Sequence, residues 1–192
     1  MTDSRVPPEM NTKPSMDTYK DYDVILKING VIHNVVLSEI TYESIEQDIS
    51  LLVKQVKDFH PTCILGIANG GMIPAALLAK KLKVDKLLSC NLKSYQSDAP
   101  RKGPHNINDI VKQISFPTQD ELMRERVLIV DDLVDTGLTL KKVYGNFVLF
   151  NDQYNITWDF ATLYYKPKTT FMPDYTVREF DNNDWIVFPW EN

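Results

Sequence analysis

Three aspartates follow a run of four apolar residues in the second half of the chain. The run, residues 127–130, is typical of a buried strand, and Asp131, Asp132 and Asp135 come soon after it. Carboxylates at the end of a strand can hold sugar hydroxyls or a hydrated Mg²⁺ ion. The segment therefore predicts a site for a hydroxyl-bearing ligand, a magnesium ion, or both.

A short loop of small residues continues from these aspartates into a helical pattern. Its members are Thr136, Gly137, Leu138 and Thr139. Backbone N–H groups in such a loop, and at the amino end of the following helix, favour an anion such as a phosphate. Asp135 could also cap this helix. Strand, acids and loop together predict a cradle for a phosphorylated sugar.

A second turn of small residues, Asn69-Gly70-Gly71, lies between an apolar run at 62–67 and a helical run at 72–82. Two glycines allow the backbone to approach an anion closely. A Gly-Gly pair is more often a plain turn, but its place between a strand and a helix favours an anion-binding loop.

The apolar periodicity predicts an α/β fold, a twisted and mainly parallel sheet flanked by helices. Strands are expected at 62–67, 86–92, 127–130, 156–165 and 173–180, and helices at 42–58, 72–82 and 138–150. Ligands of open α/β sheets bind at the carboxyl ends of the strands. The acids, the glycine turn and Lys93-Ser94-Tyr95 should therefore share one edge.

Composition narrows the functional classes. The 192 residues are 43% hydrophobic with a net charge of −5, which argues against a nucleic-acid-binding surface. Residues 1–18 lack an apolar signal core, and no 18-residue apolar run occurs, so we expect a cytoplasmic protein without a membrane role. Cys63 and Cys90 lie in apolar runs and should be buried, reduced thiols. The three histidines show no metal-ligand spacing.

One other reading of Asp135-Thr136-Gly137 is an aspartic protease, which carries this tripeptide after apolar residues. Its chemistry needs a second Asp-Thr-Gly, because two carboxylates share a proton. The chain has no second copy, and its pattern is α/β rather than all-β.

Residues 127–139 resemble the binding motif for 5-phosphoribosyl-1-diphosphate (PRPP) of the type I phosphoribosyltransferases. That motif has four apolar residues, two acids, two apolar residues and then Asp-Thr-Gly-x-Thr, and every defining position is matched here. The resemblance covers about residues 40–192 and is greatest to the xanthine–guanine (hypoxanthine) phosphoribosyltransferases.

The resemblance implies a role for each element of the cradle. Asp131 and Asp132 would hold the ribose hydroxyls, directly or through bound Mg²⁺, and Asp135 would act as general base near N7 of the purine. Residues 136–139 would bind the 5-phosphate. Asn69, Gly70 and Gly71 would form the diphosphate loop, in which purine-specific members usually have a cation where this chain has Asn69. Ser94 and Tyr95 would begin a mobile loop that closes over the centre.

The last part of the chain resembles the purine pocket of that family. Lys166 would donate to the purine 6-oxygen, Trp185 would stack on the ring, and the Ile186 carbonyl would meet the 2-substituent. Asp184 is the third expected magnesium ligand, beside Asp131 and Asp132. A lysine donor explains a preference for 6-oxopurines over adenine, whose amino group cannot accept.

Three parts are expected along the chain, and the resemblance accounts only for the last of them. We expect a flexible arm at 1–18, a β-hairpin appendage at 19–38 around Asn29-Gly30, and one domain at 39–192 that includes a C-terminal hood at 165–192. Residues 94–121 show no clear periodicity and are expected to form a long loop.

The activity implied is transfer of the phosphoribosyl group of PRPP to guanine, xanthine or hypoxanthine with Mg²⁺, in a homodimer or tetramer. Two alternatives stay open. The fold could serve as a non-catalytic module that senses PRPP or nucleotides, which Asn69 favours, or the acceptor could be a pyrimidine or a modified base.

Overall fold

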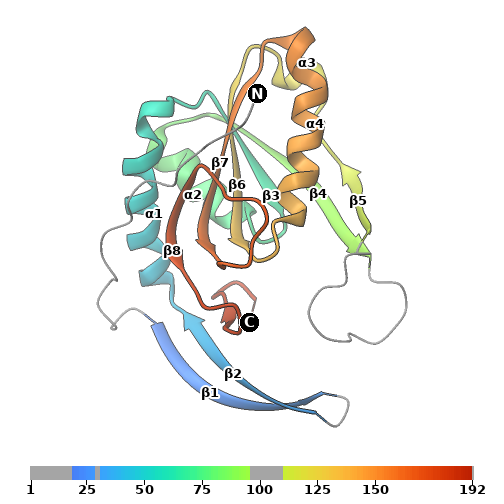
Figure 1. Cartoon of the computed structure of the whole chain (residues 1–192). Coiled ribbons are helices and arrows are strands. Elements are labelled where there is room, and N and C mark those ends of the chain that lie inside the picture. The colour runs from blue at the N-terminus through green and yellow to red at the C-terminus, as the bar shows by residue number, and fades with distance from the viewer. Residues whose placement is uncertain (1–18, 29–30, 96–109, 192) are drawn as a thin grey trace. The chain divides into compact units, whose positions relative to one another are not determined.

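The computed structural model describes residues 19–28, 31–95 and 110–191 (Figure 1). The predicted arm at 1–18, the Asn29-Gly30 turn and most of the predicted mobile loop lie outside these residues. The described chain forms two compact units. The smaller holds the residues up to Ser44 together with those from Asp184 onward, and the larger holds Ile45–Asn183.

The larger unit is built on a six-stranded sheet. Its order is β5-β4-β3-β6-β7-β8. Five strands are parallel to their neighbours, and β5 at one edge is antiparallel to β4. The bounds are β3 Cys63–Ala68, β4 Lys86–Tyr95, β5 Ile110–Ser115, β6 Arg126–Val134, β7 Thr157–Tyr165 and β8 Tyr175–Glu179. The predicted mainly parallel sheet is confirmed.

The three predicted helices are present close to their expected bounds. They are α1 Tyr42–Val56, α2 Met72–Leu82 and α4 Leu138–Tyr154. The Thr41 hydroxyl accepts a hydrogen bond from the Ser44 N–H at 3.1 Å and so caps α1. A 3₁₀ turn, η1 Lys57–Phe59, replaces the predicted last turn of α1, and His60 then leaves the helical conformation with φ of 51°.

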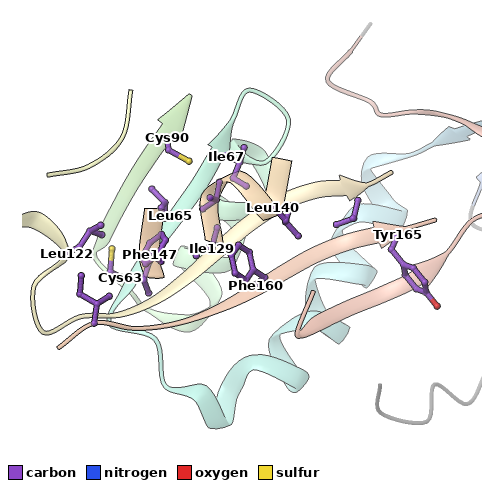
Figure 2. Packing of buried hydrophobic residues seen from close by; sticks show 14 residues of the cluster. Cys63, Leu65, Ile67, Cys90, Leu122, Ile129, Leu140, Phe147, Phe160 and Tyr165 are labelled. Atoms are coloured by element: carbon purple, nitrogen blue, oxygen red, sulfur yellow. The ribbon is translucent and has the colours of Figure 1, made fainter. Parts of the chain in front are cut away.

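Alternate side chains of the strands pack on opposite faces of the sheet. Cys63, Leu65 and Ile67 of β3 belong to one buried cluster that also contains Ile129 of β6 and Phe147 of α4 (Figure 2). Gly66, between Leu65 and Ile67, faces the other way, since a Cβ there would lie 2.7 Å from Met72 Sδ of α2. This two-sided burial explains why the strands read as continuous apolar runs.

The prediction of one long loop at 94–121 was wrong in three places. Strand β4 continues to Tyr95, β5 pairs with it from Ile110 to Ser115, and α3 Gln119–Leu122 precedes β6. A capping box forms at Thr118, whose hydroxyl accepts from the Glu121 N–H while the Glu121 carboxylate accepts from the Thr118 N–H. Such short elements lack enough apolar repeats for a periodic pattern to appear.

The smaller unit is a three-stranded sheet. Strands β1 Tyr19–Ile28 and β2 Val31–Ile40 are antiparallel, as the Asn29-Gly30 signal predicted, with Ile28 opposite Val31. Strand β9 Trp185–Val187 pairs in parallel with β2. The hairpin therefore shares a sheet with the chain's last segment, which local sequence patterns did not predict.

The structure bears on the two cysteines and on the apolar character of the helices. Cys63 and Cys90 are buried free thiols, as predicted, and burial raises the pKa of each to about 12. None of the helices in the described part of the chain combines the length and apolar character that crossing a bilayer requires.

A buried ion pair joins α1 to the far strands of the large sheet. The Arg178 guanidinium of β8 donates from Nε and Nη2 to the Asp48 carboxylate of α1, with distances of 2.6 to 2.9 Å. The Tyr164 hydroxyl of β7 donates to the same carboxylate at 2.9 Å. All three residues are buried, so this network ties three elements together without solvent.

We expect Asp48→Asn to lower the free energy of unfolding by about 3–5 kcal/mol, because it leaves the buried Arg178 charge without a carboxylate. Urea unfolding followed by circular dichroism measures this loss. Glu46→Gln on the same helix is the matched control, since Glu46 pairs with Lys81 at the surface at 3.7 Å and should contribute less than about 1 kcal/mol. Equal losses in the two variants would contradict the prediction.

Candidate functional site

Three loops follow neighbouring strands at the carboxyl edge of the large sheet. The glycine loop, residues 69–71, follows β3; the acid loop, residues 131–137, ends β6 and precedes α4; the lysine loop, residues 166–171, follows β7. Strand β6 pairs in parallel with both β3 and β7. The sheet therefore brings these three predicted segments together, with the acid loop between the other two.

The glycine loop lies directly against the acid loop. A Cβ on Gly70 would be 1.9 Å from Asp132 Oδ2, and one on Gly71 would be 2.5 Å from the Val130 carbonyl oxygen. Neither position has room for a side chain. The Gly71 N–H donates to the Ile67 carbonyl at 2.9 Å, which keeps the turn tight. Asn69, preceded by a cis peptide bond, has an exposed side chain.

The two adjacent acids are half-buried and act on each other. The Asp131 carboxylate accepts from the Asp132 N–H at 3.0 Å, and the Asp132 carboxylate accepts from the Leu133 N–H at 2.7 Å. Burial of the Asp131 carboxyl, followed by the negative charge of Asp132, raises the pKa of Asp131 well above its ordinary value. The pair therefore favours a neighbouring cation or hydroxyl donor.

The acid loop then turns sharply into α4. Gly137 is the residue before the helix and has φ of 82°, a conformation that suits glycine. The Leu138 N–H reaches the Thr136 hydroxyl at 3.5 Å. Gly137 occupies the cap position of α4, and the Asp135 carboxylate contacts lysines of the lysine loop. The amino end of α4 keeps the dipole orientation that favours an anion.

The lysine loop is fastened to the acid loop through the main chain. The Lys166 N–H donates to the Val134 carbonyl at 2.9 Å, and Thr170 donates to the Thr136 carbonyl from its N–H at 3.1 Å and its hydroxyl at 3.0 Å. A Cβ on Gly137 would lie 2.6 Å from Thr169 Oγ1 and 2.7 Å from the Phe171 nitrogen. The two loops thus pack as closely as the glycine and acid loops do.

Two lysines share one oxygen of Asp135. Lys168 Nζ lies 2.7 Å from Asp135 Oδ1, and Lys166 Nζ lies 3.8 Å from the same atom. The side chain of Lys166 is only 9% exposed, whereas those of Lys168 and Asp135 are about one-third exposed. A buried ammonium next to a carboxylate can present both a donor and an acceptor to one bound ligand.

The remaining predicted residues belong to other elements. Ser94 and Tyr95 end β4, where their backbones pair with Val111 and Ile110. Three residues, Asp184, Trp185 and Ile186, belong to the smaller unit. There the Trp185 side chain is 56% exposed, while Ile186 is buried.

Sequence reasoning missed the rest of the lysine loop. Lys168, Thr169 and Thr170 were not singled out, although Lys168 makes the shortest ion pair of Asp135 and Thr170 bonds to Thr136. A lysine followed by two threonines directly after a strand end was the available signal. It is weak, because such residues are usually solvated.

A metal ion bound at these loops would need water and substrate oxygens to complete its coordination shell. The described residues contain no group of three or more histidine, cysteine, aspartate or glutamate side chains that could hold a metal ion. Mg²⁺ commonly takes one or two carboxylates and completes its shell with water and substrate phosphates. Asp131 and Asp132, whose mutual repulsion a cation would relieve, suit that mode.

Comparisons with a family model, with protein sequences and with solved structures all find similarity to phosphoribosyltransferases. A model of the phosphoribosyl transferase domain matches residues 39–191. The xanthine-guanine phosphoribosyltransferase of Gluconobacter oxydans is 30% identical over 85% of this chain and 89% of its own length. That of Cereibacter sphaeroides is 33% identical over 67% and 68%. The structure of a purine phosphoribosyltransferase from Pyrococcus horikoshii is 30% identical, covers 81% of this chain and 94% of its own, and has a TM-score of 0.65.

The close packing of Gly137 against the lysine loop can be tested by measuring the free energy of unfolding. We expect Gly137→Ala to lower the free energy of unfolding by at least about 1–2 kcal/mol, because a left-handed conformation is costly for alanine and its methyl group meets the lysine loop. Gly145→Ala is the control in α4, where a Cβ meets nothing within 4 Å. It should raise the free energy of unfolding by up to about 1 kcal/mol.

Urea unfolding of both alanine variants measures the two effects. A Gly137 variant as stable as the unmodified protein would mean that the lysine loop can move away from the acid loop at little cost.

Proposed function

Because this chain belongs to the phosphoribosyltransferase family, we propose that it transfers the phosphoribosyl group of PRPP to N9 of a 6-oxopurine. The products are the nucleoside 5′-monophosphate and diphosphate, which makes the reaction one of purine salvage. One observation carries the proposal: the acid loop meets the glycine loop on one side and the lysine loop on the other. Sugar-phosphate, diphosphate and base chemistry would thus meet at one edge.

The ribose phosphate would be bound by the acid loop and the start of α4. Asp131 and Asp132 would accept hydrogen bonds from the ribose hydroxyls, and the amides and hydroxyls of residues 136–139 would bind the 5-phosphate. The positive φ of Gly137 and the orientation of α4 support this assignment.

The diphosphate would lie against the glycine loop. Gly70 and Gly71 pack closely against the end of β6 and present no side chain there to a bound ligand. Asn69 would donate a hydrogen bond from its exposed amide, without the positive charge that related loops usually place there. Mg²⁺ bound with Asp131 and Asp132 would supply positive charge to neutralise the diphosphate.

The purine would be recognised by a donor and an acceptor next to each other. Lys166 would donate to the 6-oxygen, and Asp135 would accept the proton at N7, which the contact between these residues supports. Trp185 would stack on the ring and Ile186 would meet the 2-substituent; the exposed indole of Trp185 is consistent with stacking. Asp184 would complete the magnesium ligands, and Ser94 and Tyr95 would begin a closing loop.

Two further assignments are proposed from the family. The enzyme would work in the cytoplasm, and it would form a homodimer or tetramer. The enzyme names of the relatives support catalysis rather than a sensor that binds PRPP without turnover.

The reaction can be tested by mixing the purified protein with PRPP, Mg²⁺ and one purine or pyrimidine base at a time, then separating nucleotides by chromatography. We expect product with guanine, xanthine or hypoxanthine, and kcat/KM at least ~10²-fold lower with adenine, because adenine leaves the Lys166 ammonium without an acceptor. Leaving out Mg²⁺ should reduce turnover sharply.

Product with none of the 6-oxopurines would contradict the proposal. If calorimetry then showed PRPP binding, the sensor function would take its place. Efficient product from a pyrimidine would keep the transfer chemistry and change the acceptor.

Asp135→Asn tests the general base. We expect kcat to fall by about 10²-fold or more while KM for PRPP changes little, because asparagine cannot take the purine proton. Asp85→Asn, an exposed carboxylate outside the three loops, serves as the control and should keep full activity. A parallel loss of kcat and PRPP affinity would mean that Asp135 mainly holds the loop structure.

A further inference from the structure

The ion pair between Lys168 and Asp135 is shorter than the pair between Lys166 and Asp135. The nitrogen-to-oxygen distances are 2.7 and 3.8 Å, and both lysines approach Oδ1. Lys166 already has a proposed partner in the purine 6-oxygen. Lys168 has no role in the function described so far.

The backbone around Lys168 is fixed on both sides. Its own N–H donates to Asn182 Oδ1 at 2.9 Å, and the Thr169 N–H donates to the Lys166 carbonyl at 3.0 Å. Thr170 is bonded to the Thr136 carbonyl in the acid loop. Because these bonds set the distance between the loops, the Lys168 side chain reaches Asp135 from a defined position.

A purine bound as proposed would change the surroundings of Asp135. Lys166 would turn its ammonium toward the 6-oxygen and so lengthen a contact that is already the longer one. Asp135 would then keep Lys168 as a close cation, and the Lys168 side chain is one-third exposed and needs no purine atom of its own. That cation holds the carboxylate in an orientation in which it faces N7.

We propose that Lys168 is a positioning residue that holds the Asp135 carboxylate ready to accept the purine proton; this inference rests on the proposed function. In the transfer step, the bond between C1 of the ribose and the diphosphate oxygen breaks, and its electron pair leaves with the diphosphate. N9 forms the new bond to C1, and the proton on N7 passes to Asp135. Lys168 acts through Asp135 and touches neither substrate.

Three substitutions of Lys168 separate charge from shape. Lys168→Met removes the charge and the donor, Lys168→Gln keeps only a donor, and Lys168→Arg keeps the charge. We expect kcat to fall about tenfold in the Met and Gln variants, with KM for PRPP and for the purine changed less than about threefold, and the Arg variant to recover most of the loss. Lys80→Met, an exposed lysine of α2, is the control and should match the unmodified enzyme.

A double-mutant cycle on stability tests the ion pair without using activity. Asp135→Asn, Lys168→Met and the double variant are unfolded in urea. We expect the single changes to be non-additive by about three- to fivefold in the unfolding equilibrium constant, the range for a partly exposed pair.

Each outcome decides the inference. Coupling in the cycle together with a kcat loss that arginine rescues supports it. Coupling with unchanged kcat would make the pair purely structural, and additive stabilities would mean that the pair does not form in solution; either overturns the inference and leaves the proposed function intact. An inactive unmodified protein would overturn the proposed function and this inference with it, whatever the cycle shows.

Discussion

Gly70 and Gly71 have no room for side chains of their own against Asp132 and the end of β6, and this constraint decides how the site is built. Hypothetical Cβ atoms on Gly70 and Gly71 would lie 1.9 Å and 2.5 Å from atoms of the acid loop and of β6. The two main chains can therefore approach until Asp132 touches the turn. Anything bound over Asp131 and Asp132 is then within reach of the backbone after β3, which is what a ligand with a sugar and a diphosphate requires.

Charge in the site is distributed unevenly across the three loops. The acid pair lies toward the glycine loop, where the pKa of Asp131 is raised by burial and by Asp132, so this side favours cations and hydroxyl donors. Asp135 lies toward the lysine loop and is matched by Lys166 and Lys168. In the proposed reaction, metal-dependent binding of the diphosphate and proton exchange with the base would therefore take place on different sides of one loop.

Buried contacts of β7, the strand that precedes the lysine loop, link this strand to α1 and β8. Tyr164 precedes this loop in β7 and donates to Asp48, which also receives the Arg178 guanidinium from β8. Asp48 belongs to α1, so one buried carboxylate links the helix to the two strands on this side of the sheet. Compared with apolar residues in its place, a buried ion pair adds little net stability, whereas removing one partner is costly; the pair joins these three elements in one arrangement.

The sequence by itself determined the parallel sheet, the three main helices and the acid and glycine loops, because apolar periodicity, caps and turn residues act over a few neighbouring positions. Such local patterns were sufficient to identify Asp131, Gly137 and Gly71 as candidate site residues. Only the tertiary structure revealed that Lys168 pairs with Asp135, that Thr170 bonds to Thr136, and that β9 joins the β2 strand of the hairpin. These contacts join residues that are far apart in the chain. They arise from the order of the strands and the packing of the loops, and neither of these produces a periodic pattern in the sequence.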